Sequence, residues 1–380
     1  MLRRERGTQP RGFQAQHGMN QHGMNHEQPS GETDPTAGGV ADLPPEAAGG
    51  DLPSLPERPI PLLLNPHAGS LFRSGLRKWL LAHDGYFRLI TSDSPEQMQG
   101  QARDLAEKGE PVIAAAGGDG TLKTAARGLL GSRSALGILP SGTMNVFARE
   151  LGIGSRRFDL ALRAMLSPRR EEVDLFTING EPFLQMAGFG LDARIVQLIT
   201  PGMKRLFGAA SHIFTALRVA TEHHAVITLT LPSGEEIIGT QLILGNGKRY
   251  GGEARLFASA AYNDGKLDAV MIQQESMGIL MEIIASMMQH GGTNRNSSQS
   301  AQFCQLAEGV ITAESKLAYQ LDGDYAGTLR PTEEAVISRL PDTLRICVPE
   351  HPVPVTAIGR LMAHPAVTAL RQRLARLREL

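Results

Sequence analysis

Two short apolar runs of this sequence end in glycine-bearing turns that lead directly into helix-like segments. Residues 111–117, PVIAAAG, run into the turn GGDGT at 117–121, and residues 135–140, ALGILP, run into the turn LPSGTMN at 139–145. Runs of that length suit buried strands. Strands that alternate with helices predict a parallel sheet covered on both faces. Ligands of such sheets bind at the carboxyl ends of the strands, which is where these turns lie.

The alternation of strand and helix begins further upstream. Two more buried strands are expected at 60–65 and 87–91, and helical spacing marks the stretches 71–83, 95–108 and 121–130. After about residue 170 the pattern changes to alternating strands, at 224–231, 236–246 and 266–272, separated by turn residues. A helix with a Met and Ile stripe is expected at 277–290, where core packing is favoured over the lining of an acyl-chain channel.

Length and charge narrow the class of protein. The chain has 380 residues, enough for roughly two domains, and a formal net charge of −1, which gives no nucleic-acid signature. Cys304 and Cys347 are far apart, so a reducing cytoplasm is the natural compartment. Residues 1–57 are rich in Gly, Pro, Gln and Asn and are expected to be a disordered tail that carries no export signal. No apolar run is long enough to predict a membrane span.

The turns themselves suggest phosphate binding. In GGDGT, backbone N–H groups at a helix start can approach an anion directly, and LPSGTMN repeats the arrangement one strand further on. A third candidate is NPHAGS at 65–70, where Gly69 permits a backbone shape closed to other residues. Asp119 contradicts a bare anion site unless a divalent cation or a transferable proton is present, and it has no evident structural reason to interrupt the glycines.

Three motifs, NPHAG at 65–69, GGDGT at 117–121 and LPSGTMNVFAREL at 139–151, resemble the diacylglycerol kinase catalytic domain family of bacterial diacylglycerol kinases, sphingosine kinases and ceramide kinases. The resemblance continues in GFGLDARI at 188–195, in residues 250–272 and in YQLDGDYAG at 319–327, and so covers about residues 59–349. It implies an amino-terminal α/β domain like those of phosphofructokinases and NAD kinases, a carboxyl-terminal β-rich sandwich, and an active site between them.

The resemblance also implies site residues and cofactors. ATP would be held, with Mg²⁺, by residues of the three turns: Asn65, Gly69, Gly117, Gly118, Gly120, Thr121, Gly142, Thr143 and Asn145. Asp119 would orient the magnesium nucleotide. Asp324, in the sequence LDGD, stands where family members carry the glutamate proposed as the base, and Asp322 would help fix that turn. Val146 replaces a family carboxylate of the magnesium network, so that either the network is reorganised or the enzyme is weakened.

The resemblance also assigns expected roles to three further acidic residues. Asp174 corresponds to an acid of the magnesium and water network, with turn capping as the alternative. Asp264 and the carbonyl of Lys266 correspond to the ligands of a structural magnesium found in some bacterial relatives, although an ordinary hairpin turn explains the same residues. Asp192 matches the residue that holds the polar lipid head in sphingosine kinases, with helix capping as the alternative.

The predicted organisation is a tail at 1–57, a nucleotide-binding α/β domain at 58–168, a β-rich lipid domain at 169–330, a segment at 331–349 that packs back on the first domain, and a basic amphipathic extension at 350–380. That extension would lie on a membrane surface or, more commonly for such a helix, pack on its own protein or a second copy. The leading hypothesis is a cytoplasmic lipid kinase that visits the inner membrane and acts on diacylglycerol or a sphingoid-like lipid. The alternatives are a soluble-substrate kinase resembling NAD kinase and a non-catalytic lipid or nucleotide sensor.

Overall fold

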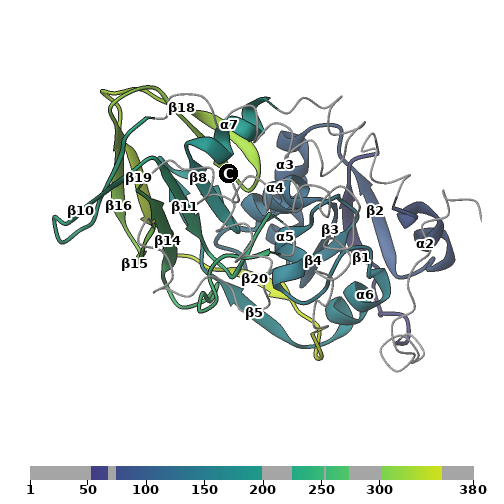
Figure 1. The fold of residues 1–380 in the computed structure, drawn as a ribbon. Helices are drawn as coiled ribbons and strands as arrows, with labels where there is room; N and C mark the ends of the chain where they lie inside the picture. Colours follow the sequence, from purple (N-terminus) through teal and green to yellow (C-terminus); the bar gives the residue numbers. More distant parts are fainter. Residues whose placement is uncertain (1–52, 67–73, 199–224, 252–253, 274–300, 353–380) are drawn as a thin grey trace, which may run out of the picture. The chain divides into compact units, whose positions relative to one another are not determined.

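The computed structural model describes residues 53–66, 74–198, 225–251, 254–273 and 301–352. Most of the predicted tail, the turn residue Gly69, the predicted helix at 277–290 and nearly all of the predicted extension at 350–380 lie outside the described residues. The described residues form three six-stranded sheets and one two-stranded pair (Figure 1).

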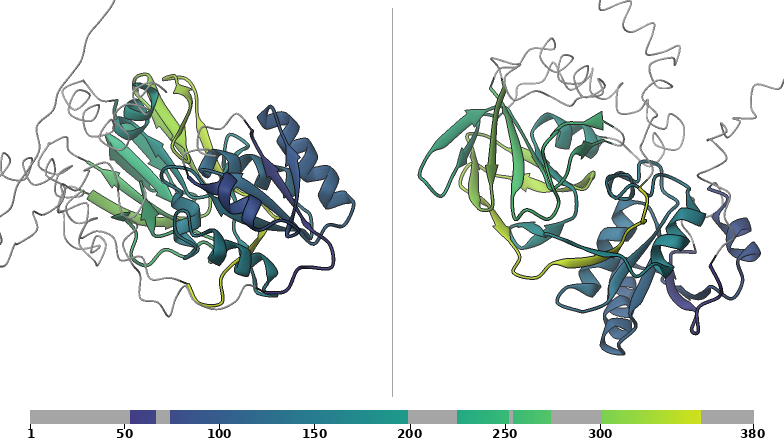
Figure 2. Two further views of the ribbon diagram at one scale, coloured as in Figure 1. Left: turned by 90° about the vertical axis from the view of Figure 1, so that its right-hand side faces the viewer. Right: turned by 90° about the horizontal axis from the view of Figure 1, so that it is seen from below.

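The first sheet is the predicted parallel sheet. It contains β1 (Ile60–Leu64), β2 (Phe87–Thr91), β3 (Val112–Gly117), β4 (Ala135–Pro140), β5 (Arg170–Val173) and β20 (Leu344–Cys347). The strands lie in the order β2-β1-β3-β4-β20-β5, and all are parallel except β5, which runs antiparallel to β20. Each of the first four expected strands is found within one residue of its expected bounds. Through β20, the end of the described chain returns to the sheet that its beginning started (Figure 2).

Helices cover this sheet and connect its strands. They are α2 (Leu76–Ala82), α3 (Pro95–Glu107), α4 (Asp119–Leu129), α5 (Val146–Glu150) and α6 (Phe158–Leu166). The first of these begins later than the expected start at residue 71, directly after Gly75. α3 begins where the sequence predicts, because Ser94 accepts a hydrogen bond from the amide of Gln97 and Pro95 occupies the first turn. α3 and α4 pack closely, since a Cβ on Gly128 would lie 2.4 Å from the carbonyl oxygen of Gln99.

The second domain is an antiparallel sandwich of two sheets. One sheet contains β6 (Phe176–Ile178), β7 (Glu181–Phe183), β9 (Ile227–Thr230), β10 (Glu236–Gly239), β16 (Gly309–Ala313) and β19 (Ala335–Arg339), in the order β10-β9-β16-β19-β6-β7. The other contains β8 (Met186–Phe189), β11 (Gln241–Gly245), β14 (Leu267–Ile272), β15 (Ala301–Leu306), β17 (Leu317–Leu321) and β18 (Asp324–Leu329), in the order β15-β14-β11-β8-β17-β18. The helix α7 (Leu191–Leu198) and the pair β12 (Arg249–Tyr250) and β13 (Ala254–Arg255) accompany it. One buried cluster draws side chains from both sheets, which therefore share a core. The predicted fold class is confirmed.

The expectation of a single strand over 236–246 is wrong. The chain leaves one sheet at Gly239 and enters the other at Gln241, so the run is divided into β10 and β11. The crossing brings the chain against β14: the amide of Thr240 donates to the carbonyl of Ile272 at 2.8 Å, and a Cβ on Gly239 would stand 2.4 Å from that same oxygen. Apolar spacing alone does not show at which residue a strand changes sheets.

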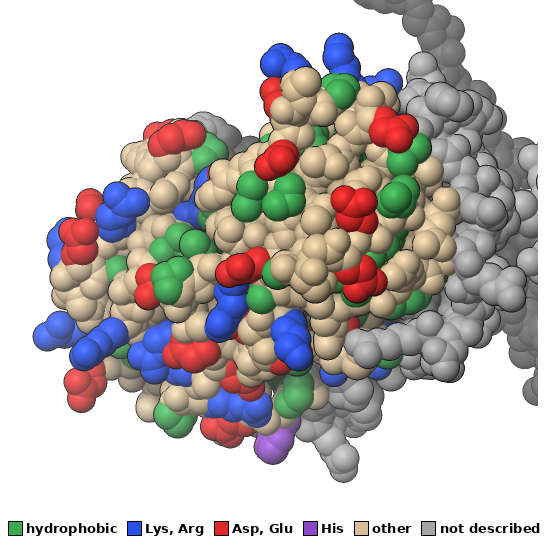
Figure 3. Space-filling view, turned by 90° about the vertical axis from the view of Figure 1, so that its left-hand side faces the viewer, with side chains coloured by type: hydrophobic (Ala, Val, Ile, Leu, Met, Phe, Trp, Pro, Cys, Tyr) green, Lys and Arg blue, Asp and Glu red, His purple; other side chains and the backbone are tan. Residues whose placement is uncertain are grey.

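Two surface properties bear on membrane contact. None of the helices among the described residues is long and apolar enough to cross a bilayer. On the face drawn in Figure 3, Lys and Arg side chains are interspersed with Asp and Glu side chains, and hydrophobic side chains are scattered between them. That described face therefore carries mixed charge rather than a field of one sign.

Candidate functional site

The two glycine turns lie against each other at the ends of neighbouring strands. Gly117 pairs with Pro140 in the register of β3 and β4, and its carbonyl accepts hydrogen bonds from the amides of Ser141 and Gly142 at 3.0 and 3.2 Å. A Cβ on Gly142 would lie 2.4 Å from the Cα of Gly118. No side chain fits between the two turns at this contact, and their role as a phosphate cradle stays a prediction.

Asp119 begins α4, directly after the first glycine turn, and its side chain contacts the start of α5, which follows the second glycine turn. Its carboxylate accepts the amides of Val146 and Phe147, both at 3.1 Å, and so caps the start of α5. Burial raises the pKa of Asp119 above its ordinary value, while the hydrogen bonds from Phe147 and Val146 oppose the rise. The aspartate among the glycines thus has a structural reason, contrary to the expectation from the sequence. Val146 is itself buried, and its amide serves this contact.

Asn145 shapes the turn before α5. It adopts a left-handed backbone conformation with φ 48°, which asparagine tolerates better than most residues, and its side chain is fully buried. Its amide nitrogen donates to the carbonyl of Gly142 and to the hydroxyl of Ser155, both at 2.9 Å. Its side-chain oxygen has no hydrogen-bond partner within the described part of the chain. Thr143 is exposed, whereas the Thr121 side chain packs where a Cβ on Gly117 would stand, at 2.3 Å.

Asp324 reaches the GGDGT turn from the second domain. One of its carboxylate oxygens lies 3.2 Å from the position of a Cβ on Gly120 and 3.6 Å from the ammonium of Lys123. The same ammonium donates to the carbonyl of Leu321 at 3.3 Å. The Lys123 side chain is only 14% exposed and the Asp324 side chain 58% exposed. The predicted base therefore stands beside the predicted phosphate turn and still reaches solvent.

Lys123 is the residue that sequence reasoning missed. It occupies the first turns of α4, two positions after GGDGT, and holds the hairpin that carries Asp324 through a charge and a hydrogen bond. Its position two residues after a predicted phosphate-binding turn is the sequence signal that could have identified it. Its contact with the second domain depends on tertiary packing that the sequence does not display.

Asp322 fixes the turn between β17 and β18. Its carboxylate accepts the amides of Leu184, Gln185 and Met186 at 2.8–3.1 Å, and its backbone is left-handed, with φ 55°. Burial raises the pKa of this carboxyl group, and the nearby Lys123 charge is the first of several influences that lower it. Asp322 thus ties the hairpin that bears Asp324 to the strand before α7.

Asp174 is engaged by the second domain. Its carboxylate accepts the Arg339 guanidinium at 2.5 Å and the amide of Gly265 at 2.6 Å. The nearby Asp264 carboxylate accepts the amide of Lys266 at 3.0 Å, which is the contact of an ordinary turn. The structure brings the Asp174 and Asp264 loops together. Among the residues it describes, no three His, Cys, Asp or Glu side chains gather as a metal site requires.

Asp192 lies buried in the second domain, at the start of α7. One carboxylate oxygen accepts the hydroxyl of Tyr250 at 3.0 Å and the amide of Gln320 at 3.1 Å, and it stands where a Cβ on Gly188 would be. Burial raises the pKa of Asp192 above its ordinary value, and burial together with the Asp192 charge raises the pKa of Tyr250.

Asn65, the first residue of the third predicted phosphate turn, directly follows β1 and precedes residues that the structure does not describe.

Comparisons with known proteins agree with the two domains. Residues 59–178 match the sequence model described as "Diacylglycerol kinase catalytic domain", and residues 185–348 match the one described as "YegS C-terminal NAD kinase beta sandwich-like domain". A protein of Pseudomonas aeruginosa named "Probable lipid kinase YegS-like" is 34% identical over 191 residues, which are 48% of this chain and 63% of that protein.

A "Diacylglycerol kinase" of Bacillus subtilis is 25% identical over 235 residues, which are 60% of this chain and 76% of that enzyme. The match to the Pseudomonas relative thus spans a little under two thirds of its length, and the match to the Bacillus enzyme about three quarters. Among solved structures, a putative diacylglycerol kinase from Bacillus anthracis superimposes with a TM-score of 0.63 at 21% identity, over 78% of this chain and 97% of that one. This last likeness shows a common fold.

Proposed function

Because the chain carries the diacylglycerol kinase catalytic domain followed by the YegS-type carboxyl-terminal domain, we propose that it is an ATP-dependent lipid kinase. Its acceptor would be a hydroxyl of diacylglycerol or of a sphingoid-like lipid. One observation carries the proposal: Asp324 of the second domain lies against Gly120 of the GGDGT turn. A carboxylate is thereby placed beside a backbone cradle, which is the pairing that phosphoryl transfer to an alcohol requires.

The cradle supports nucleotide binding. The contact between Gly118 and Gly142 leaves backbone N–H groups, rather than side chains, at the start of α4, and such groups bind phosphate oxygens. The proposed ATP-binding set therefore remains the one that the three turns predict: Asn65, Gly69, Gly117, Gly118, Gly120, Thr121, Gly142, Thr143 and Asn145.

Oxygen atoms of the kind that magnesium binds lie beside the two glycine turns. They belong to the carboxylate of Asp119 and to the side-chain oxygen of Asn145, which is buried without a hydrogen-bond partner in the described residues. Hard oxygen ligands of this kind are those that Mg²⁺ prefers. Bound there, the ion would balance phosphate charge. For Asp174 the contacts with Arg339 and Gly265 favour a supporting role, and Asp264 with the Lys266 carbonyl stays a proposed second magnesium site.

In the proposed reaction Asp324 accepts the proton of the acceptor hydroxyl as that oxygen bonds to the γ-phosphorus of ATP, while the bond from that phosphorus to the bridging oxygen breaks and ADP leaves. Lys123 positions the Asp324 hairpin over the GGDGT turn, and Asp322 fixes the connecting turn of that hairpin through three amides. Asp119 holds the start of α5, and with it the second glycine turn, in place. These contacts hold the reacting groups in position, which is most of what a protein contributes to this chemistry.

The acceptor side is proposed from Asp192. Its buried carboxylate, which accepts hydrogen bonds from Tyr250 and Gln320, would offer a polar contact for a lipid head group. A lipid acceptor would require the enzyme to visit a membrane surface, and we propose peripheral, cytoplasmic association. Assembly as a homodimer stays a prediction.

The test is a phosphotransfer assay on the purified chain. We expect label from γ-labelled ATP to appear in at least one lipid of a panel containing diacylglycerol, ceramide and sphingosine, and none in NAD. Label in NAD instead would favour the soluble-substrate kinase. Nucleotide binding with no labelled product from any acceptor would favour the non-catalytic sensor.

Matched variants locate the base. Asp324→Asn is expected to lower kcat by about 10²-fold or more, as loss of a general base does, while the Kd of ATP stays within about twofold. Glu308→Gln removes a carboxylate from an exposed position of the same domain and serves as the control. Equal rates for the wild type and Asp324→Asn would remove Asp324 from the mechanism.

A further inference from the structure

A second concave region lies at the opposite end of α5 from Asp119. Two adjoining cavities, of about 360 and 370 Å³, share the residues Glu150, Arg249, Arg255 and Tyr262 as walls. Each volume is at the lower end of the range for small-molecule sites. Together the cavities are lined by five basic side chains, those of Arg149, Arg169, Lys248, Arg249 and Arg255, and by the two acidic side chains of Glu150 and Glu171. The walls therefore carry an excess of three positive charges.

The acidic side chains are already engaged by the protein. The Glu150 side chain is only 4% exposed and accepts the amides of Lys248 and Arg249 at 3.1 and 3.0 Å. Glu171 accepts the Arg169 guanidinium at 2.7 Å and the hydroxyl of Tyr262. Neither carboxylate is left to neutralise the remaining cations.

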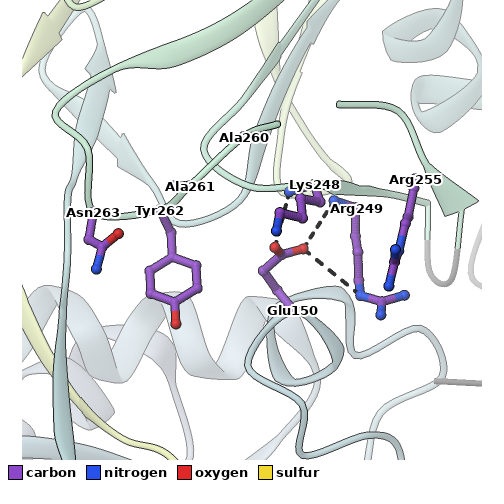
Figure 4. A pocket seen from close by; sticks show the side chains of 8 residues that line it. All are labelled: Glu150, Lys248, Arg249, Arg255, Ala260, Ala261, Tyr262 and Asn263. Carbon is purple, nitrogen blue, oxygen red and sulfur yellow. Dashed lines mark hydrogen bonds and ion pairs between the residues drawn. The ribbon is translucent and has the colours of Figure 1, made fainter. Parts of the chain in front are cut away.

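Two of the basic side chains are uncommitted. Within the described part of the chain, the Lys248 ammonium and the Arg255 guanidinium form no hydrogen bond or ion pair, and both residues are exposed. Figure 4 shows them with Arg249 around Glu150, at one side of the cavity whose other side is formed by Tyr262 and Asn263. Two free cations at the mouth of a polar cavity match a ligand that bears two negative charges on neighbouring oxygens.

We propose that this cavity binds a phosphate group through Lys248 and Arg255. A phosphate presents several acceptor oxygens, and the forked guanidinium and the point charge of an ammonium both bind it well. The phosphate could belong to a membrane lipid head group or be free in solution, and these sources share the same chemistry. The site is separate from the glycine turns, so it stands or falls independently of the proposed kinase activity.

Binding of two probes by the full chain tests the site. In one arm, vesicles of phosphatidylcholine with phosphatidic acid, and vesicles of phosphatidylcholine alone, are sedimented with the protein. In the other arm, inorganic phosphate is titrated calorimetrically. The double variant Lys248→Gln, Arg255→Gln is expected to weaken binding of the recognised probe by about tenfold or more, as the loss of charge-assisted hydrogen bonds does. The control Lys316→Gln, Arg330→Gln removes the same charge from exposed positions of the same domain.

The outcomes separate the sources of phosphate. Weakened binding only to phosphatidic acid vesicles assigns the site to a lipid head group, and weakened binding only of inorganic phosphate assigns it to a free ion. The proposal is overturned if neither probe binds, or if the double variant and the control bind alike. The latter result would also be obtained if phosphate bound only at the glycine turns. Melting temperatures of both variants near that of the wild type show that the fold is retained.

Discussion

Gly142→Ala tests the contact on which the nucleotide cradle depends. The added Cβ would lie 2.4 Å from the Cα of Gly118 and 2.7 Å from the side-chain oxygen of Asn145, whereas ordinary Cβ contacts begin at 3.4 Å. The two turns would therefore have to separate by about 1 Å. Neither neighbour yields easily, because one is backbone and the other is a fully buried side chain.

Two measurements follow from this displacement. Overpacking of this kind costs about 1–3 kcal/mol, which urea unfolding of the variant should show as a lower free energy of unfolding. A shift of about 1 Å at groups that position a substrate can cost about 10²-fold, so kcat/KM for ATP should fall much further than the loss of stability suggests. Calorimetric titration with a non-hydrolysable ATP analogue should show the weakened binding directly.

Gly100→Ala is the matched control. Gly100 lies inside α3 with nothing within 4 Å of its added Cβ, so alanine should stabilise the helix by about 0.5–1 kcal/mol and leave nucleotide affinity unchanged. If Gly142→Ala unfolded like the wild type and bound the analogue equally well, the two turns would not lie in contact, and the cradle would have to be abandoned.

Three further substitutions test other contacts of the site. Lys123→Met removes the charge beside Asp324 and should lower kcat about fivefold, the equivalent of about 1 kcal/mol for a partly exposed pair, with less change in KM for ATP; a change in KM alone would instead place Lys123 on the nucleotide. Arg339→Leu removes the ion pair of the buried Asp174 carboxylate and leaves it with the hydrogen bond from the Gly265 amide. The free energy of unfolding should fall by about 1–3 kcal/mol. The control Arg330→Leu breaks an exposed ion pair and should lower it by about 0–1 kcal/mol. Asp192→Asn tests a pH dependence. Burial raises the pKa of Asp192 in the folded state, so folding favours the protonated carboxyl group. The stability that this preference contributes is complete below the ordinary pKa of 3.8 and is lost as pH rises through the pKa of the folded state. Urea unfolding between pH 4 and pH 8 should therefore show the asparagine variant gaining stability relative to the wild type as pH rises, and a constant difference would contradict the raised pKa.

Local signals in the sequence were sufficient for the first four strands of the first sheet and for the positions of the two glycine turns, but not for β5 and β20. β3 and β4 are short apolar runs bounded by glycine and proline, and their adjacency follows from the alternation with helices. The position of Asp324 over Gly120 was within reach only through resemblance to a family, because the contact joins a turn of one domain to a hairpin of the other.

Other features required the folded chain. Asp119 caps a helix that begins at Val146, and no spacing rule relates an aspartate to amides so far along the sequence. The division of 236–246 into two strands depends on how closely Gly239 approaches Ile272. The ion pair between Asp174 and Arg339 likewise joins residues that are distant in the chain. The sequence therefore could not show that Asp174, predicted to belong to the magnesium network, also has a structural contact.

The charges at the glycine turns connect the two departures from the family pattern, Val146 and Asp324. Asp324 lies beside the cation Lys123, and the amides of Val146 and Phe147 hold the Asp119 carboxylate. A carboxylate at position 146 would add a second negative charge close to Asp119, whereas the valine adds none. A triphosphate would add further negative charge at these turns, and in the proposed function a divalent cation would offset it.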